Sequence, residues 1–355
     1  MKKIIMPDDQ KQMSAEEEEI LKFIQESRPK IYVVGTGGSG CNTLTRLAEL
    51  GIEGATLVAM NTDAQHLLHT KADKKVLLGK KLTRGLGAGS DPKVGEEAAK
   101  ESIEEIKQAL TDASMVFVTC GLGGGTGTGS AHVIAQAAKD MGALTIGVVT
   151  LPFSSEGKIR HQNALDGLTK LKRQVDTLIV IKNDKLLSVA PDLPLKTAFK
   201  ISDEILAGSV KGITELITKP GEVNVDFADL RTVLSNAGWG VVGIGESSVE
   251  ASPDERALVA VETALNSPLL DVDISGATKA LVNIVGGEDM TMKEAETIVS
   301  EVANRISPEA HIIWGARIED NQQKSNIKVL VVLGGVKFGE TRSKQSLPID
   351  LEVIG

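Results

Sequence analysis

A glycine-rich stretch, Gly121 to Ser130 (GLGGGTGTGS), has the composition of an anion-binding turn. It follows a β-branched run, Ala113 to Thr119, and precedes an apolar helical pattern that starts at Ala131. Glycines let the backbone pass close to a ligand, and the helix that follows offers free N–H groups and the positive end of its dipole. The pattern therefore predicts a phosphate site at a strand-to-helix turn. A solvated glycine-rich loop is the alternative interpretation.

Two further glycine-rich turns occur earlier in the chain. The first, Gly35 to Gly40, follows a predicted strand over 30–34 and matches the G-x-G-x-x-G pattern of dinucleotide-binding proteins. A strand over 55–60 then ends in Asn61-Thr62-Asp63, which places an acid where a Rossmann domain holds a ribose. The second turn, Thr83 to Pro92 (TRGLGAGSDP), also precedes a helical pattern. A dinucleotide needs one such turn, so several converging turns favour a triphosphate.

The chain has no G-x-x-x-x-G-K-[ST] motif, so it is not a P-loop protein. Backbone amides, helix dipoles and a hard cation would then have to neutralise the phosphate charge. We expect Mg²⁺ in that role, with K⁺ as an alternative. The histidines do not form a metal-ligand set, and His66 and His69 are interpreted as surface or capping residues. We therefore predict no metal site built by protein side chains alone.

A group of polar side chains, Asn224, Asp226 and Asp229, follows a long helical pattern that runs from about Thr197 to Lys219. The two aspartates would face one way if they open a helix. Two carboxylates and an amide could polarise a water molecule and hold a cation. Capping of the helix N-terminus by an aspartate is the alternative, and the spacing alone does not decide between them.

The order of elements predicts an α/β fold, in which a doubly wound, mostly parallel sheet is joined by a long central helix to a smaller α+β domain. At 355 residues the chain is long enough for two domains. The expected divisions are an N-terminal extension with a short helix (1–29), a nucleotide-binding domain (30–198), the central helix (199–220), an α+β domain (221–340) and a tail (341–355).

Composition excludes several classes of function. A net charge of −9 and an aromatic content of 3% argue against general nucleic-acid binding, because no basic surface or set of stacking rings is evident. No run of apolar residues is long enough to insert into a membrane, and the N-terminus lacks the core of a signal peptide. With only Cys41 and Cys120 the chain cannot form a disulfide framework. We therefore expect a cytoplasmic protein without direct membrane insertion.

These motifs, in this order, resemble the FtsZ family, the prokaryotic relatives of tubulin. The resemblance rests on GLGGGTGTGS, on the Asn61-Thr62-Asp63-Ala64-Gln65 and Thr83-to-Pro92 stretches, on Phe153 to Arg160, and on Asn224 to Asp229 (NVDFAD), and it covers about residues 30–340. The early helix and the short tail make the chain most similar to archaeal members. The resemblance implies a GTPase that polymerises head to tail into protofilaments and forms the cell-division ring.

The resemblance also implies roles for single residues. Phosphates would be bound by the first turn and by the GGGTGTG turn, with the γ-phosphate near the Ala88 turn, while Glu156 and Arg160 would contact the ribose and phosphate side. Asn183 and Asp203, the latter at the start of the long helix, would read guanine, and Phe199 would pack on the base. The full predicted set is Gly37, Gly38, Ser39, Gly40, Cys41, Asn42, Asn61, Asp63, Ala88, Gly89, Ser90, Gly124, Gly125, Thr126, Gly127, Thr128, Glu156, Arg160, Asn183, Phe199 and Asp203.

In this interpretation Asn224, Asp226 and Asp229 enter the nucleotide site of the adjacent subunit, so hydrolysis waits for assembly. The main partner is then another copy of the chain. The apolar residues of Leu347 to Gly355 predict a peptide that binds a membrane adaptor or another division protein, at the division site on the inner face of the membrane. The alternatives are an NAD(P)-dependent oxidoreductase built on Gly35 to Asp63 and a nucleotide-binding scaffold without turnover.

Overall fold

The computed structural model describes residues 28–185, 194–247, 255–270, 272–319 and 326–337. Their strands form one sheet in the order β3-β2-β1-β4-β5-β6-β7-β10-β8-β9. The predicted N-terminal helix and the predicted adaptor-binding tail lie outside the described residues. None of the helices in the described ranges is both long enough and apolar enough to span a bilayer.

The first part of the sheet is parallel throughout. Its strands are β1 (Ile31–Thr36), β2 (Ala55–Asn61), β3 (Lys74–Leu77), β4 (Met115–Gly121), β5 (Leu144–Leu151) and β6 (Thr177–Lys182). Each neighbouring pair among them runs in the same direction. Parallel strands bring their carboxyl ends to one edge, so the turns that follow β1, β2, β4 and β5 meet there, as the sequence predicts.

Helices cover both faces of this parallel sheet. One face carries α5 (Pro92–Glu101), α6 (Ile103–Ala109), α7 (Thr126–Asp140) and α8 (Lys158–Lys172). The other carries α2 (Gly37–Leu50), α3 (Ala64–His69), α10 (Leu195–Thr218) and α11 (Phe227–Leu234). Two short helices, α4 (Lys80–Thr83) and the 3-10 helix η1 (Ser154–Glu156), lie in the connections. Each face thus buries its own apolar core, which is the doubly wound arrangement that was predicted.

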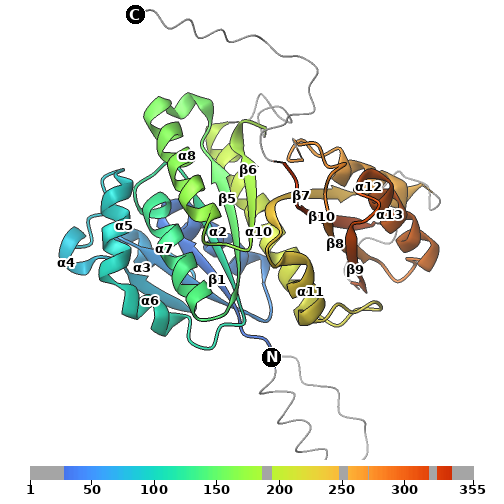
Figure 1. Cartoon of the computed structure of the whole chain (residues 1–355), viewed down its shortest axis with the longest axis horizontal. Helices are drawn as coiled ribbons and strands as arrows, with labels where there is room; N and C mark the ends of the chain where they lie inside the picture. Colours follow the sequence, from blue (N-terminus) through green and yellow to red (C-terminus); the bar gives the residue numbers. More distant parts are fainter. Residues whose placement is uncertain (1–27, 186–193, 248–254, 271, 320–325, 338–355) are drawn as a thin grey trace, which may run out of the picture.

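The C-terminal part is a smaller α+β unit. It contains β7 (Gly238–Glu246), α12 (Arg256–Leu265), β8 (Lys279–Gly286), α13 (Met292–Arg305), β9 (His311–Ile318) and β10 (Lys328–Gly334). The β7 strand pairs in parallel with β6 and antiparallel with β10, so the sheet continues from one part into the other. A separate core forms between these strands and α12 and α13. Figure 1 shows this unit in orange and red beside the blue-to-green parallel part.

The α10 helix packs against both parts of the molecule. Its buried Leu206, Val210 and Ile213 share one core with strands of the parallel sheet and with Val242 and Leu281 of the C-terminal part. Its 24 residues correspond to a length of about 36 Å. The sequence predicts this helix as a connecting strut, and the structure confirms that it contacts both parts (Figure 1).

Several helix bounds differ from the predicted ones. After the first glycine turn the sequence predicts a helix that starts at Asn42, but α2 already begins at Gly37. After Pro92 the apolar pattern through Glu96, Ala99, Ile103 and Ile106 predicts one helix, yet the structure has α5 and α6, divided at Ser102. The side chain of Ser102 accepts a hydrogen bond from Gly79 N at 3.0 Å. That long-range bond cannot be inferred from local periodicity.

Candidate functional site

The glycine turn after β1 (Gly35 to Gly40) and the glycine turn after β4 (Gly121 to Ser130) are in direct backbone contact. A Cβ atom added to Gly37 would lie 2.7 Å from Gly127 N, and one added to Gly40 would lie 2.5 Å from Thr119 O. Gly37 also has a φ of +70°, which side chains disfavour. The turns after β1 and β4 can therefore approach this closely only because they are made of glycine.

The segment after β2 (Asn61 to Asp63) and the Thr83-to-Pro92 turn, called the Ala88 turn below, pack against these two glycine turns. Thr62 Oγ1 lies 2.6 Å from Thr126 Oγ1, which links the end of β2 to the start of α7. A Cβ atom on Gly125 would lie 2.9 Å from Asp91 N and from Ala88 Cβ, so the Ala88 turn packs against the GGGTGTG turn. Segments that lie far apart in the sequence are thus brought together at the carboxyl edge of the sheet.

The N-termini of α2 and α7 are left open in a way that suits an anion. Neither helix has a side-chain cap, whereas Asp63 caps α3 and Asp91 caps α5. The first N–H groups of α2 and α7 have no partner within their own helices. Two converging helix ends with free N–H groups and glycine backbone can hold the charge of a phosphate chain.

Some residues predicted to contact the ligand are buried and form hydrogen bonds at the glycine turns. Thr128 is buried, and its Oγ1 accepts a hydrogen bond from Gly123 N at 2.8 Å. Asn61 is buried too, with Oδ1 accepting from Asp63 N at 3.2 Å and Nδ2 donating to Cys41 Sγ at 3.7 Å. Burial raises the pKa of the Cys41 thiol, which keeps it neutral. We therefore interpret Thr128, Asn61 and Cys41 as supports for the turns.

The residues predicted to read a base lie between the end of β6 and α10. Asn183 is buried and accepts a hydrogen bond from Ser202 Oγ at 2.9 Å. Phe199 is 40% exposed, and its ring meets that of Phe153 edge to face with centroids 5.3 Å apart. Asp203 lies in the third turn of α10 and not at the helix start, because the helix begins earlier, at Leu195.

The carboxyl group of Asp203 has a raised pKa. Burial raises its pKa to about 6, and a 3.5 Å hydrogen bond from Thr43 Oγ1 only partly offsets this effect. It lines a cavity of about 350 Å³ between α2, α3 and α10, together with Asn42 and His66. A carboxylate held in a partly buried cavity is well suited to accept hydrogen bonds from a ligand that brings its own donors.

His66, which the sequence analysis interprets as a surface or capping residue, has a ring that lines the same cavity. Its Nε2 lies 3.1 Å from Asn42 Oδ1, and its ring is 3.5 Å from where a Cβ on Gly38 would be. The ring therefore covers the first glycine turn. Its position three residues after the Asp63 cap is the only sequence signal, and it indicates a helix turn without showing what that turn faces.

Glu156 and Arg160 form an ion pair beside the glycine turns. Glu156 Oε2 lies 2.9 Å from Arg160 Nε. Their spacing of four residues predicts that they could share one helix face, but Glu156 belongs to η1 and Arg160 to α8. A Cβ on Gly123 would lie 2.8 Å from Arg160 Cγ. Arg160 is thus placed next to the turn that is predicted to bind phosphate.

The acidic segment, Asn224 to Asp229, lies at the opposite end of α10. Just before it, Thr218 Oγ1 donates to Glu53 O at 3.0 Å in the turn that leads into β2. Just after it, Arg231 Nη2 donates to Gly142 O at 3.3 Å in the turn that leads into β5. These contacts are at the amino ends of the strands, whereas the glycine turns are at the carboxyl ends. Figure 1 shows α11 at this lower side of the molecule.

Within the acidic segment the side chains of Asn224, Asp226 and Asp229 are exposed. Asp226 caps α11, because its Oδ1 accepts from Asp229 N at 2.8 Å. Asn224 Oδ1 accepts from Gly221 N at 2.9 Å. The capping alternative is therefore correct for Asp226 as a description of local structure, and it leaves the carboxylates facing outward.

Two family models match the chain. Residues 30–191 match the GTPase domain of the Tubulin/FtsZ family, and residues 238–337 match the C-terminal domain of the FtsZ family. The chain is 58% identical to cell division protein FtsZ 1 of Methanocaldococcus jannaschii over 326 residues, which is 92% of this chain and 88% of that protein.

Solved structures agree with these matches. An empty FtsZ dimer from M. jannaschii superposes with a TM-score of 0.85 at 58% identity, over 91% of this chain and 93% of that one. CetZ2 from Haloferax volcanii, a GTPγS-bound protofilament, gives a TM-score of 0.75 at 25% identity, over 88% of this chain and 95% of that one. Neither the oxidoreductase nor the scaffold alternative gains support from these matches.

The contacts of the GGGTGTG turn predict that two neighbouring glycines respond differently to alanine. A Cβ on Gly124 meets nothing within 4 Å, so Gly124→Ala should change the free energy of unfolding by less than about 0.5 kcal/mol. A Cβ on Gly125 would overlap the Ala88 turn, so Gly125→Ala should lower it by about 1–3 kcal/mol. Denaturant unfolding of both variants measures the difference, and equal losses would contradict the packing of the two turns.

Proposed function

Because this chain belongs to the Tubulin/FtsZ family, as a member of the FtsZ cell-division GTPases, we propose that it binds GTP and GDP. We propose further that it assembles head to tail and hydrolyses GTP at a site shared by two subunits. The uncapped ends of α2 and α7 and the Ala88 turn would hold the phosphates. Asp203 and Asn183 would read guanine. The filaments would act in the division ring, at the inner face of the membrane.

The observation that carries the shared-site proposal is the separation of the two halves within one subunit. Asp203 and Thr218 are both in α10, and their separation of 15 positions along the helix corresponds to about 22 Å. The acidic segment lies beyond Thr218, at the other edge of the sheet. Its carboxylates cannot reach the glycine turns of the same chain, but they face outward where a second copy can approach.

Head-to-tail stacking would place the acidic segment of one subunit over the phosphates held by the next. A water molecule would attack the γ-phosphorus while the bond to the β-phosphate oxygen breaks, giving GDP and inorganic phosphate. Asp226 and Asp229 would orient this water and accept its proton, with Asn224 as a further hydrogen-bonding group. An interface of this kind joins unlike surfaces, so it propagates as an open filament.

Exposed apolar side chains near the glycine turns support such an interface. Leu86, within the turn that precedes Ala88, is 85% exposed, and Leu68 of α3 and Ile159 of α8 are also largely exposed. Leu86 belongs to the Thr83-to-Pro92 turn itself, and Ile159 directly precedes Arg160, which packs against Gly123. Burying them against a neighbouring subunit would favour assembly through the hydrophobic effect.

We propose Mg²⁺, with K⁺ as the alternative, as the cation that accompanies the phosphates. Among the residues that the structure describes there is no cluster of three His, Cys, Asp or Glu side chains able to hold a metal ion. Phosphate oxygens and water would therefore provide most ligands, which is typical of Mg²⁺ bound with a nucleotide. The ion would neutralise charge along the triphosphate.

The shared site predicts that hydrolysis rises more steeply than linearly with protein concentration. Asp229→Ala should lower GTP turnover by about 100-fold or more, because a water-orienting carboxylate is lost. Its GTP affinity should stay unchanged, since the residue is remote from the glycine turns of its own chain. Phosphate release over a protein concentration series measures this, with the exposed Asp166→Ala on α8 as the control. Normal turnover by Asp229→Ala would disprove the shared site.

Guanine recognition by Asp203 predicts a pH dependence. Its raised pKa, about 6, means that the carboxyl is protonated below that pH and cannot accept hydrogen bonds from both N1 and N2 of guanine. GDP affinity should therefore be constant above pH 7 and fall by up to about tenfold per pH unit below pH 6. Calorimetric titrations at several pH values measure it. Asp203→Asn should bind weakly with a flat profile, and an equally flat profile in the unaltered chain would exclude this role.

The tail proposal is tested by removing residues 341–355, which include the apolar peptide Leu347 to Gly355. The truncated chain should assemble with GTP as the full chain does, because it keeps the glycine turns, α10 and the acidic segment. It should lose capture of a membrane-associated partner in a pull-down with filaments as bait. Unchanged capture would show that the adaptor binds elsewhere.

A further inference from the structure

The chain that enters the acidic segment is fixed to strand β9. Val223 N donates to Ala316 O, and Ala316 N donates to Val223 O, both at 3.1 Å, as an isolated antiparallel bridge. A Cβ on Gly221 would lie 2.5 Å from Ala316 O, so the two backbones are in close contact there as well. The position of β9 therefore determines where Asn224 begins.

Arg317, the residue after that bridge, forms a buried ion pair with α10. Its Nη2 donates to Glu215 Oε2 at 2.6 Å and lies 2.9 Å from Glu319 Oε1. Glu215 is 1% exposed and Arg317 is 9% exposed. Glu215 lies one turn before the end of α10 at Thr218. The pair thus joins the last turn of α10 to β9 at the point where the chain leaves the helix for the acidic segment.

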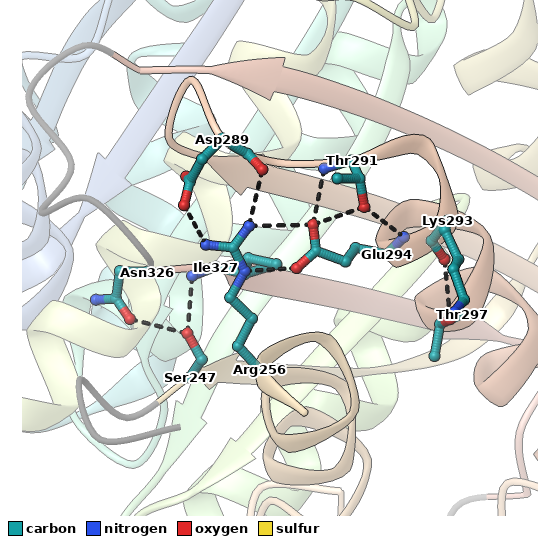
Figure 2. A network of polar contacts seen from close by, with 9 residues as sticks. All are labelled: Ser247, Arg256, Asp289, Thr291, Lys293, Glu294, Thr297, Asn326 and Ile327. Carbon is teal, nitrogen blue, oxygen red and sulfur yellow. Dashed lines mark hydrogen bonds and ion pairs between the residues drawn. The ribbon is translucent and has the colours of Figure 1, made fainter. Parts of the chain in front are cut away.

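This pair is poorly optimised for stability alone. The Nε and Nη1 atoms of Arg317 are buried without a hydrogen-bond partner in the part of the chain that the structure describes. A buried ion pair with unsatisfied donors contributes little net stability, because desolvation opposes the attraction. Arg256 is different: Figure 2 shows its guanidinium bonded to Glu294 through Nε at 2.5 Å and to Asp289 through Nη1 at 2.7 Å, with Nη2 also paired.

We infer that Arg317 is a positioning residue for hydrolysis: through Glu215 it holds β9, and with it Val223, in a fixed place relative to α10. This inference rests on the proposed shared site. Loss of the pair would allow the connection between Thr218 and Asn224 to shift. A small displacement of water-orienting carboxylates lowers turnover strongly, while the nucleotide pocket at the other end of α10 is unaffected.

The test compares full-length variants for GTP turnover, GDP affinity and thermal unfolding. Arg317→Met removes the guanidinium but leaves Glu215 paired, since Lys219 Nζ lies 2.8 Å from Glu215 Oε1. This variant should therefore fold. Arg317→Lys keeps a positive charge that can reach Glu215. Arg256→Met is the matched control, because it breaks a buried arginine pair of the same C-terminal unit that does not touch α10 or the acidic segment.

Turnover is read as the slope of phosphate release against protein concentration above the assembly threshold. Arg317→Met should reduce this slope by about tenfold with GDP affinity within about twofold of the unaltered chain. Arg317→Lys should recover part of the loss. Arg256→Met should lose stability but keep its slope. If Arg256→Met does not fold, Arg305→Met, which loses the pair with Glu262 on the surface of the same unit, replaces it.

Asp229→Ala is measured alongside to separate the two proposals. An inactive Asp229→Ala with an unchanged Arg317→Met slope would overturn the role of Arg317 and leave the shared site standing. A fully active Asp229→Ala would overturn both. An equal loss of slope in Arg317→Met and in the folded control would show a general effect of domain stability, which also overturns the positioning role.

Discussion

The packing of α10 against both parts of the sheet is the constraint on which the remaining structure depends. Its buried side chains belong to one continuous core that includes strands of the parallel part and of the C-terminal part. Polar contacts reinforce this on either side, with Lys211 Nζ donating to Leu50 O at 2.7 Å and Asn283 Nδ2 donating to Gly212 O at 3.0 Å. A helix held along its length acts as a rigid spacer. It keeps the glycine turns and the acidic segment at opposite edges of one subunit.

Glycine serves a packing purpose at one of those edges. A methyl group at Gly37 or Gly40 would overlap backbone atoms of Gly127 or Thr119, so the turn after β1 lies directly against the end of β4 and the turn that follows it. A methyl group at Gly125 would overlap Ala88 and Asp91 of the Thr83-to-Pro92 turn. Because the turns after β1 and β4 touch, the uncapped N-termini of α2 and α7 lie side by side. The proposed anion binding would thus follow from this backbone contact, and the hydroxyl pair of Thr62 and Thr126 holds the turns together.

Much of this could be predicted from the sequence, because the relevant signals are local. Strand-turn-helix order with glycine at each turn predicts the parallel sheet and the edge at which the turns meet, and a Pro220-Gly221 pair after a long apolar period predicts the end of α10. Features that depend on distant partners were not predictable. The break at Ser102, the ring of His66 over Gly38 and the pairing of Arg317 with Glu215 all join residues whose proximity is set only by the completed fold. The burial that raises the pKa of Asp203 also depends on residues distant in the sequence, so it could not be predicted either.

Capping of α11 by Asp226 is compatible with the role in hydrolysis that we propose for this residue. Capping uses one carboxylate oxygen, Oδ1, as acceptor for Asp229 N. A carboxylate has about four lone-pair sites, so the second oxygen retains its capacity to bind a water molecule. The cap restricts the rotamer of Asp226 and fixes the first turn of α11, in which Asp229 lies. A side chain already held in place would lose less entropy on docking of a neighbouring subunit, so local helix capping would prepare the segment for the proposed shared site.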